Sequence, residues 1–105
     1  MSGSMVWSHP DDVTPSQVGQ GITLHQLWDH EDGAKALVVD IAPGASWPEL
    51  DVHAPGPEEV YVARGTFNDG VRDYPEGSFI HCPAGSSHWP QSVTGCRLFV
   101  FYPQG

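Results

Sequence analysis

The chain has 105 residues, a length that fits one domain with one core. Four Lys or Arg face thirteen Asp or Glu, so the net charge of −9 excludes the basic surface that holds nucleic acid or an anionic membrane. The sequence has no run of about 18 apolar residues and no charged-then-apolar leader. We therefore expect a soluble, cytoplasmic protein with neither nucleic acid nor membrane as its partner.

The chain begins with a polar, turn-rich stretch. We expect residues 1–20 to be an N-terminal extension, of which residues 1–4 (MSGS) could be left over from cloning. Residues 21–105 are then predicted to form a single domain. Gly and Pro number 12 and 10 without a repeat period, which indicates many turns between short strands rather than disorder.

Several short runs predict β-strands. Residues 22–28 alternate apolar and polar side chains, with Ile22, Leu24 and Gln26 on one face. No segment keeps a 3.6-residue period over three turns. Short strands at this density predict an antiparallel sandwich or barrel, whose mouth is the usual place for a small ligand. The other strand-like runs are ALVVDIA (36–42), EVYVARG (59–65), VRDY (71–74), EGSFIHC (76–82) and CRLFVFY (96–102).

The stretch LDVHAPGPEEVYVARG, residues 50–65, puts an imidazole and several carboxylates around a tight turn ahead of an apolar strand. It is either a polar hairpin loop or half of a metal site. Glu58 and Glu59 are neighbours on the predicted strand, where successive side chains face opposite ways. Only one of them can therefore share a site with His53, and we expect that one to be Glu58.

The stretch GSFIHCPAGSSHWPQS, residues 77–92, has the same design. Pro83 ends a strand, Gly85 permits a tight turn, and His88 stands at the start of the next strand. Two antiparallel strands that carry His residues can converge inside a barrel. With one carboxylate they form a two-His, one-carboxylate set, which holds a divalent metal and leaves coordination positions open.

These residues carry a resemblance to the cupins. The spacing Gly77, five residues, Pro83, one residue, Gly85, two residues, His88 is that of the second cupin motif, and Ser92 stands where the motif usually ends in Asn.

The first cupin motif is HxH, three or four residues, Glu, six residues, Gly. Its second His, its Glu and its Gly correspond to His53, Glu58 and Gly65, and Asp51 stands at the place of the first His.

From residue 36 to 102 the chain resembles the small cupins related to the ChrR-type anti-sigma factor and to acetylacetone-cleaving dioxygenases. The resemblance implies an all-β cupin barrel, a double-stranded β-helix or jelly roll, with a metal held by His53, Glu58 and His88. Asp51 either adds a fourth ligand or stays free, which leaves more room for substrate and water. A set of carboxylates and imidazoles favours Fe(II), Zn(II), Mn(II) or Ni(II) over soft metals.

Three other residues could be functional or structural: His81, and Cys82 and Cys96 as functional thiols. His81 is either a base or substitute ligand beside the site or, as we prefer, part of the barrel wall. Cys82 and Cys96 form no disulfide framework and no CxxC zinc pair, so we expect both to be small buried apolar residues.

Three functions are compatible with the resemblance. The first is a metal-dependent enzyme, dioxygenase-like or an isomerase, cyclase or hydrolase, that acts on a small chelating organic molecule with Glu58 as the catalytic base. The second is a metal or small-ligand sensing module related to ChrR, which would need a partner. The third is a cupin that has lost its metal, with Asp51 marking the loss. Small cupins commonly pair through edge strands, so we also expect a homodimer.

Overall fold

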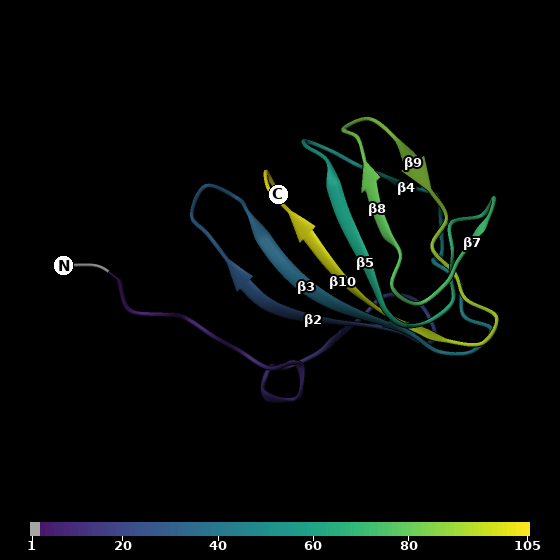
Figure 1. Cartoon of the computed structure of the whole chain (residues 1–105), viewed down its shortest axis with the longest axis horizontal. Coiled ribbons are helices and arrows are strands. Elements are labelled where there is room, and N and C mark those ends of the chain that lie inside the picture. Colours follow the sequence, from purple (N-terminus) through teal and green to yellow (C-terminus); the bar gives the residue numbers. More distant parts are fainter. Residues whose placement is uncertain (1–2) are drawn as a thin grey trace.

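The computed structural model describes residues 3–105, which form an antiparallel β structure with one short 3-10 turn (Figure 1). Met1 and Ser2, half of the stretch attributed to cloning, lie outside the described residues. The elements are η1 (Pro10–Asp12), β1 (Ser16–Gln17), β2 (Ile22–Asp29), β3 (Lys35–Ile41), β4 (Asp51–Val52), β5 (Glu58–Gly65), β6 (Phe67–Asn68), β7 (Asp73–Tyr74), β8 (Phe79–Cys82), β9 (Ser87–His88) and β10 (Cys96–Tyr102).

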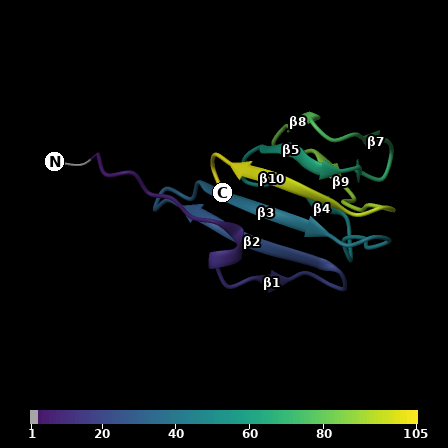
Figure 2. The same ribbon diagram turned by 60° about the horizontal axis from the view of Figure 1, so that its bottom comes forward.

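The strands form one large sheet and two small ones. The large sheet has the order β1-β2-β3-β10-β5-β8, and β4 pairs with β9 as β6 pairs with β7 (Figure 2). Figure 1 shows the large sheet curved along one side and β4, β7 and β9 on the other. The prediction of an all-β antiparallel barrel or sandwich is confirmed. The four long strands β2, β3, β5 and β10 agree with the predicted runs to within one residue at each end.

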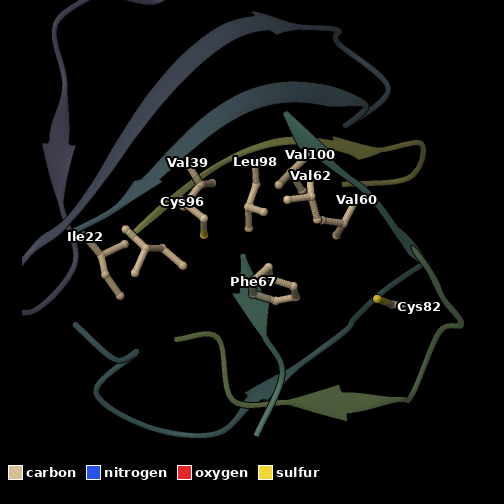
Figure 3. Packing of buried hydrophobic residues seen from close by; sticks show 10 residues of the cluster. Ile22, Val39, Val60, Val62, Phe67, Cys82, Cys96, Leu98 and Val100 are labelled. Carbon is tan, nitrogen blue, oxygen red and sulfur yellow. The ribbon is translucent and has the colours of Figure 1, made fainter. Parts of the chain in front are cut away.

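The core fills the space inside the curve of the large sheet (Figure 3). Side chains that alternate between the two faces of each strand supply this core. On β10 the buried residues are Cys96, Leu98 and Val100, and the residues between them face outward. On β5 the buried row continues through Val62 and Val60. The next residue of that row is a carboxylate, Glu58. Packing of the apolar residues therefore directs this carboxylate into the interior.

The outer face of the large sheet carries an aromatic row. Phe79 on β8 pairs with Tyr61 on β5, and Tyr61 pairs with Phe99 on β10. The three residues are 65%, 47% and 40% exposed. They are therefore neighbours on the surface, not members of the core. We call Phe79, Tyr61 and Phe99 the outer aromatic row.

The predicted N-terminal extension contains part of the large sheet. Ser16 and Gln17 form β1, which pairs with β2 at the edge of that sheet. The division into an extension and a barrel domain at residues 20 and 21 stays a prediction. Within residues 3–105, no helix has the length and apolar character needed to cross a membrane.

Candidate metal centre

The two halves of the predicted site meet on the small β4–β9 sheet. Asp51 on β4 lies directly opposite His88 on β9. The pairing continues past the strands, because the His53 amide donates to the Ser86 carbonyl at 2.9 Å and the Gly85 amide donates to the His53 carbonyl at 2.8 Å. Gly85 has φ +84°, which glycine adopts without strain. The tight turn at Gly85 thus fixes His53 against the segment that carries His88.

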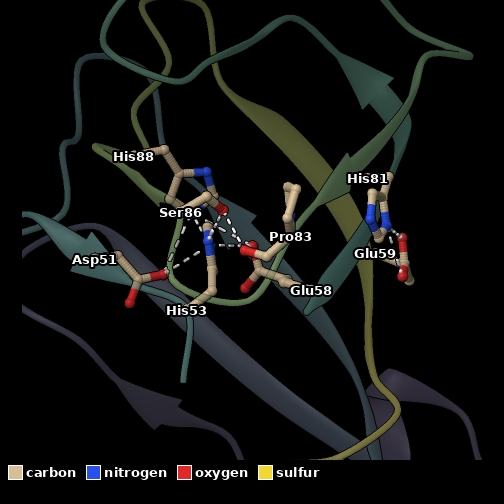
Figure 4. A network of polar contacts seen from close by, with 8 residues as sticks. All are labelled: Asp51, His53, Glu58, Glu59, His81, Pro83, Ser86 and His88. Carbon is tan, nitrogen blue, oxygen red and sulfur yellow. Dashed lines mark hydrogen bonds and ion pairs between the residues drawn. The ribbon is translucent and has the colours of Figure 1, made fainter. Parts of the chain in front are cut away.

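Four predicted site residues converge inside the barrel (Figure 4). The Nε2 atoms of His53 and His88 lie 3.1 Å apart. Glu58 Oε1 lies 3.1 Å from His53 Nε2 and 3.4 Å from His88 Nε2. Asp51 Oδ2 is 3.3 Å from His88 Nε2 and 3.8 Å from His53 Nε2. Two imidazole nitrogens and the Glu58 oxygen therefore face one point, and Asp51 lies beside them, nearer to His88 than to His53.

This arrangement fits a divalent metal ion. Two ligands that each lie about 2.0–2.1 Å from a tetrahedral ion are about 3.3 Å apart. The separations of 3.1 and 3.4 Å between the Glu58 oxygen and the two imidazoles match that value. His53, Glu58 and His88 are all at least nine-tenths buried. Because buried charges are retained only where they are paired or bind metal, so dense a group of donors is typical of an ion site.

Ser86 determines which nitrogen of His53 faces the cluster. The Ser86 hydroxyl donates its proton to the Pro83 carbonyl at 2.6 Å, so its oxygen is left as an acceptor. His53 Nδ1 lies 2.9 Å from that oxygen and therefore carries the ring proton of the neutral imidazole. His53 Nε2 then presents its lone pair to the cluster. A hydrogen bond of this kind orients most metal-binding histidines.

Asp51 lies at the mouth of the site. Its side chain is 27% exposed, against 5% for Glu58. In the metal-free chain, the hydrogen bond from His88 lowers the pKa of Asp51, although partial burial opposes this effect. Asp51 is thus a carboxylate with partial access to solvent, placed between water and the buried donors.

Glu59 and His81 lie outside the cluster. His81 Nδ1 is 2.7 Å from Glu59 Oε1, and the imidazole side chain is 54% exposed. Figure 4 shows this pair apart from the other labelled residues. The two residues face each other across β5 and β8 on the outer face of the sheet. Glu58, the neighbour of Glu59, takes the inward position.

Sequence reasoning missed a fifth residue at this point. Cys82 is buried as expected, but it is not simply part of the apolar core. Its sulfur and one donor atom each of His53, Glu58 and His88 all lie within 4.8 Å of one another. Burial, followed by the charges of Glu58 and Glu59, raises the pKa of Cys82 to about 12. One signal in the sequence could have located it. Cys82 comes two residues after the apolar Ile80, so on a strand that pairs with β5 the two side chains face the same way.

A small apolar cavity adjoins the donors. It has a volume of about 40 Å³ and is bordered by Asp51, Glu58 and His88. Burial and the neighbouring Glu58 raise the pKa of Tyr102 on its wall, so this hydroxyl stays protonated. The rest of the wall includes Leu24, Val39, Trp47, Phe67 and Leu98.

A larger cleft lies elsewhere on the molecule. It has a volume of about 620 Å³, and its lining includes Asp40, Arg64, Thr94 and Gly95. Glu58 and His88, which border the smaller cavity, are absent from the lining residues of this cleft. The chemistry of the donor atoms, rather than the size of the hollow, therefore identifies the smaller cavity as the candidate site.

The chain is similar to a described family and to solved structures. The model of the ChrR cupin-like domain matches residues 4–104. The polyketide cyclase RemF from Streptomyces resistomycificus has a TM-score of 0.82 at 22% identity, over 97% of this chain and 81% of that one. The acetylacetone dioxygenase from Acinetobacter johnsonii has a TM-score of 0.81 at 16% identity, over 98% of this chain and 75% of that one.

A third similar structure is the complex of SigE with the anti-sigma ChrR from Rhodobacter sphaeroides. Its TM-score is 0.74 at 22% identity, over 89% of this chain and 50% of that one. No protein of curated function matches the sequence. At these identities the three structures establish the shared fold and leave the chemistry to the site residues.

Proposed function

Because the chain belongs to the family of ChrR cupin-like domains, we propose that it is a metal-dependent enzyme acting on a small chelating organic substrate. The observation that carries the proposal is the convergence of His53, Glu58 and His88 beside an apolar cavity. A divalent ion bound there supplies a Lewis acid for a carbonyl or enol oxygen. Fe(II), Zn(II), Mn(II) and Ni(II) all suit this donor set.

The residues of the chain have separate roles in this proposal. His53, Glu58 and His88 hold the ion, and Ser86 keeps His53 in the tautomer that binds it. When Glu58 releases the ion it is the catalytic base, because its carboxylate borders the cavity where a substrate proton would lie. Asp51, at the mouth, is the fourth ligand or stays unbound, which leaves more room for substrate and water.

The cavity limits the substrate. Its free volume is small, about 40 Å³, which favours a compact substrate. Lys and Arg are absent from its described lining residues, and two carboxylates border it. We infer a short neutral molecule that chelates through two oxygens, such as a small β-diketone or its enol, rather than a phosphate or a polycarboxylate. Dioxygenase-like cleavage and isomerisation are the reactions we favour.

Metal content tests this proposal first. Wild type purified after growth with added metal is compared by elemental analysis with His88→Ala and Asp51→Ala. We expect near-stoichiometric metal in wild type and its loss in His88→Ala. Loss in Asp51→Ala as well would make Asp51 a ligand, and retention would leave three ligands. A wild type without metal would overturn the proposal and leave residues 50–65 as a polar turn.

Turnover is the second test. Metal-loaded wild type is mixed with acetylacetone, and oxygen consumption and loss of enol absorbance are recorded. We expect turnover in wild type, and a loss of at least about 100-fold in Glu58→Gln at equal metal content if this carboxylate is the base. Variants of the exposed pair, such as His81→Ala, serve as controls that keep the activity.

A sensing module is the second candidate. The small cavity favours it, because a site with little free space can bind an ion or a small ligand without any chemistry. Stoichiometric metal with no turnover of a panel of small diketones, enols and lactones would favour this function. Turnover that depends on Glu58 would exclude it as the principal role.

We further propose a homodimer. The outer aromatic row is supporting evidence, because three adjacent aromatic side chains that are 65%, 47% and 40% exposed form a surface that a second copy could cover. β8 is in addition a free edge of the large sheet in the described residues. The cytoplasmic location expected from the sequence is compatible with the two free cysteines.

A further inference from the structure

We propose that Cys82 is a ligand of the metal and makes the centre selective for zinc over manganese and iron. This inference rests on the proposed function, since it concerns the same ion. It differs in the donor set: two imidazoles, one carboxylate and one thiolate, in place of imidazoles and carboxylates alone. Thiolate is the soft donor in the chain that could change which metal the site prefers.

Strand register puts the sulfur at the site. Cys82 on β8 lies directly opposite Glu58 on β5, just as Asp51 on β4 lies opposite His88 on β9. Two cross-strand pairs, one from each sheet, thus deliver side chains to the same point. Because directly opposite residues project to the same face of a sheet, the inward position of Glu58 requires Cys82 to point inward too.

The distances suit a tetrahedral ion. The sulfur and the three other donor atoms lie within 4.8 Å of one another. In a tetrahedral zinc site a nitrogen and a sulfur are about 3.6 Å apart, since the bonds measure about 2.0–2.1 and 2.3 Å. Since no distance within the group exceeds 4.8 Å, and the sulfur turns on a single side-chain bond, the thiolate can reach an ion held by the other three donors.

Cys82 and Asp51 approach the site from different sides. Cys82 is 7% exposed and belongs to the group of four mutually close donors, whereas the Asp51 side chain is 27% exposed and lies outside that group. With Cys82 bound, one carboxylate and one thiolate neutralise a divalent charge inside the barrel. Asp51 then stays at the mouth without a bond to the ion, as a second carboxylate near it. The buried ion is left without excess charge.

The second cysteine provides an internal contrast. Cys96 is just as buried, at 8% exposed, but lies on β10 opposite Gly65 and Ile41. In Figure 3 it lies among the aliphatic side chains, whereas Cys82 lies at the rim of the group. Cys96 is therefore the expected apolar thiol, and a matched control for Cys82.

Cobalt substitution tests the inference. Apoprotein is loaded with Co(II), and the near-ultraviolet spectrum is examined for the thiolate-to-cobalt charge-transfer band. We expect the band in wild type and in Cys96→Ser, and its absence in Cys82→Ser with cobalt still bound. Zinc affinity, measured by competition with a chelator, should fall at least about tenfold in Cys82→Ser, while Mn(II) affinity changes little.

A measurement on wild type avoids dependence on a variant that could fail to fold. X-ray absorption of the zinc-loaded protein should detect one sulfur at about 2.3 Å. Zinc coordinated only by nitrogen and oxygen, or cobalt-loaded wild type without the charge-transfer band, would overturn the role of Cys82 and leave the proposed metal site intact. Failure of wild type to bind any divalent metal would overturn both.

Discussion

His53 and His88 are separated by 35 positions in the chain, yet their Nε2 atoms lie 3.1 Å apart. Their rings meet edge to face, with centroids 4.4 Å apart. Glu58, which lies on the large sheet, completes the group from the opposite side. The centre therefore joins the small β4–β9 sheet to the large sheet.

Metal removal should lower stability. An ion that binds only the folded chain stabilises it by about 2.7 kcal/mol at a concentration 100 times its dissociation constant. For a domain of this size that corresponds to a change in Tm of roughly 10–20 °C. A chelator should therefore lower the Tm of metal-loaded wild type by this amount. His81→Ala should respond like wild type and His88→Ala should not respond. An unchanged Tm in protein known to carry metal would contradict the prediction.

Ser86→Ala should weaken metal binding. Without the hydroxyl, His53 loses the acceptor that fixes its tautomer, and such losses cost about 10- to 100-fold in metal affinity. Ser78→Ala is a matched control, because Ser78 donates to Pro75 in the same Pro-x-Gly-Ser turn that Ser86 forms with Pro83. Competition with a fluorescent chelator measures both. Equal affinity losses in the two variants would indicate a general effect on the turns.

Gly65→Ala should destabilise the fold much more than Gly77→Ala. Both glycines have positive φ, +78° and +91°, so either substitution costs about 1–2 kcal/mol of backbone strain. At Gly65 a Cβ would also overlap the Gly95 carbonyl oxygen, whereas at Gly77 it would meet no atom within 4 Å. We expect a total of about 3 kcal/mol or more at Gly65, measured by denaturant unfolding. Similar losses of unfolding free energy in the two variants would show that backbone strain, and not the overlap with Gly95, causes the destabilisation.

The Asp40–Arg97 pair should make stability depend on acid. Arg97 binds Asp40 through two hydrogen bonds of 2.7 and 2.8 Å, which lowers the pKa of Asp40 below 3.8 despite partial burial. A lowered carboxyl pKa contributes stability above the unfolded value of 3.8, and this is lost as the pH falls through the folded value. Asp40→Asn should cost about 1 kcal/mol near neutral pH, since solvent screens the pair, and almost nothing in strong acid. A pH-independent difference in unfolding free energy would contradict this.

Charge on the outer aromatic row should prevent association. Tyr61→Lys together with Phe99→Lys places two cations on the surface assigned to the second copy, and desolvating them would oppose a dimer. Val71→Lys is the control, because Val71 is 92% exposed and lies outside the row. Light scattering should give a dimeric mass for wild type and the control, and a monomeric mass for the double variant. A monomeric mass for wild type would contradict the proposed homodimer.

Much of this structure could be predicted from particular residues. The alternation in CRLFVFY gave the buried strand of residues 96–102, and the spacing Pro83, Gly85, His88 identified one half of the site. The resemblance to ChrR-type and acetylacetone-cleaving cupins is confirmed by the family model and by similar structures.

The orientation of residues 79–82 could not be predicted. There the aromatic Phe79 and the polar His81 share the outer face, and Ile80 and Cys82 face inward. The hydrophobicity of these residues therefore does not predict which side of the strand faces the core. Since a shift of one residue reverses every side chain, only pairing with β5 decides that Cys82 points at the donors.

The brevity of the β4–β9 ribbon has a consequence for motion. Each of its strands has two residues, and they carry Asp51 and His88. Short ribbons open at low energy cost when nothing else holds them. An ion bound by both His88 and Glu58 would hold the ribbon against the large sheet and keep it closed. Without it, the amides of His53 and Gly85 would exchange with solvent far sooner than those of β10, so the centre would govern access to the barrel as well as its chemistry.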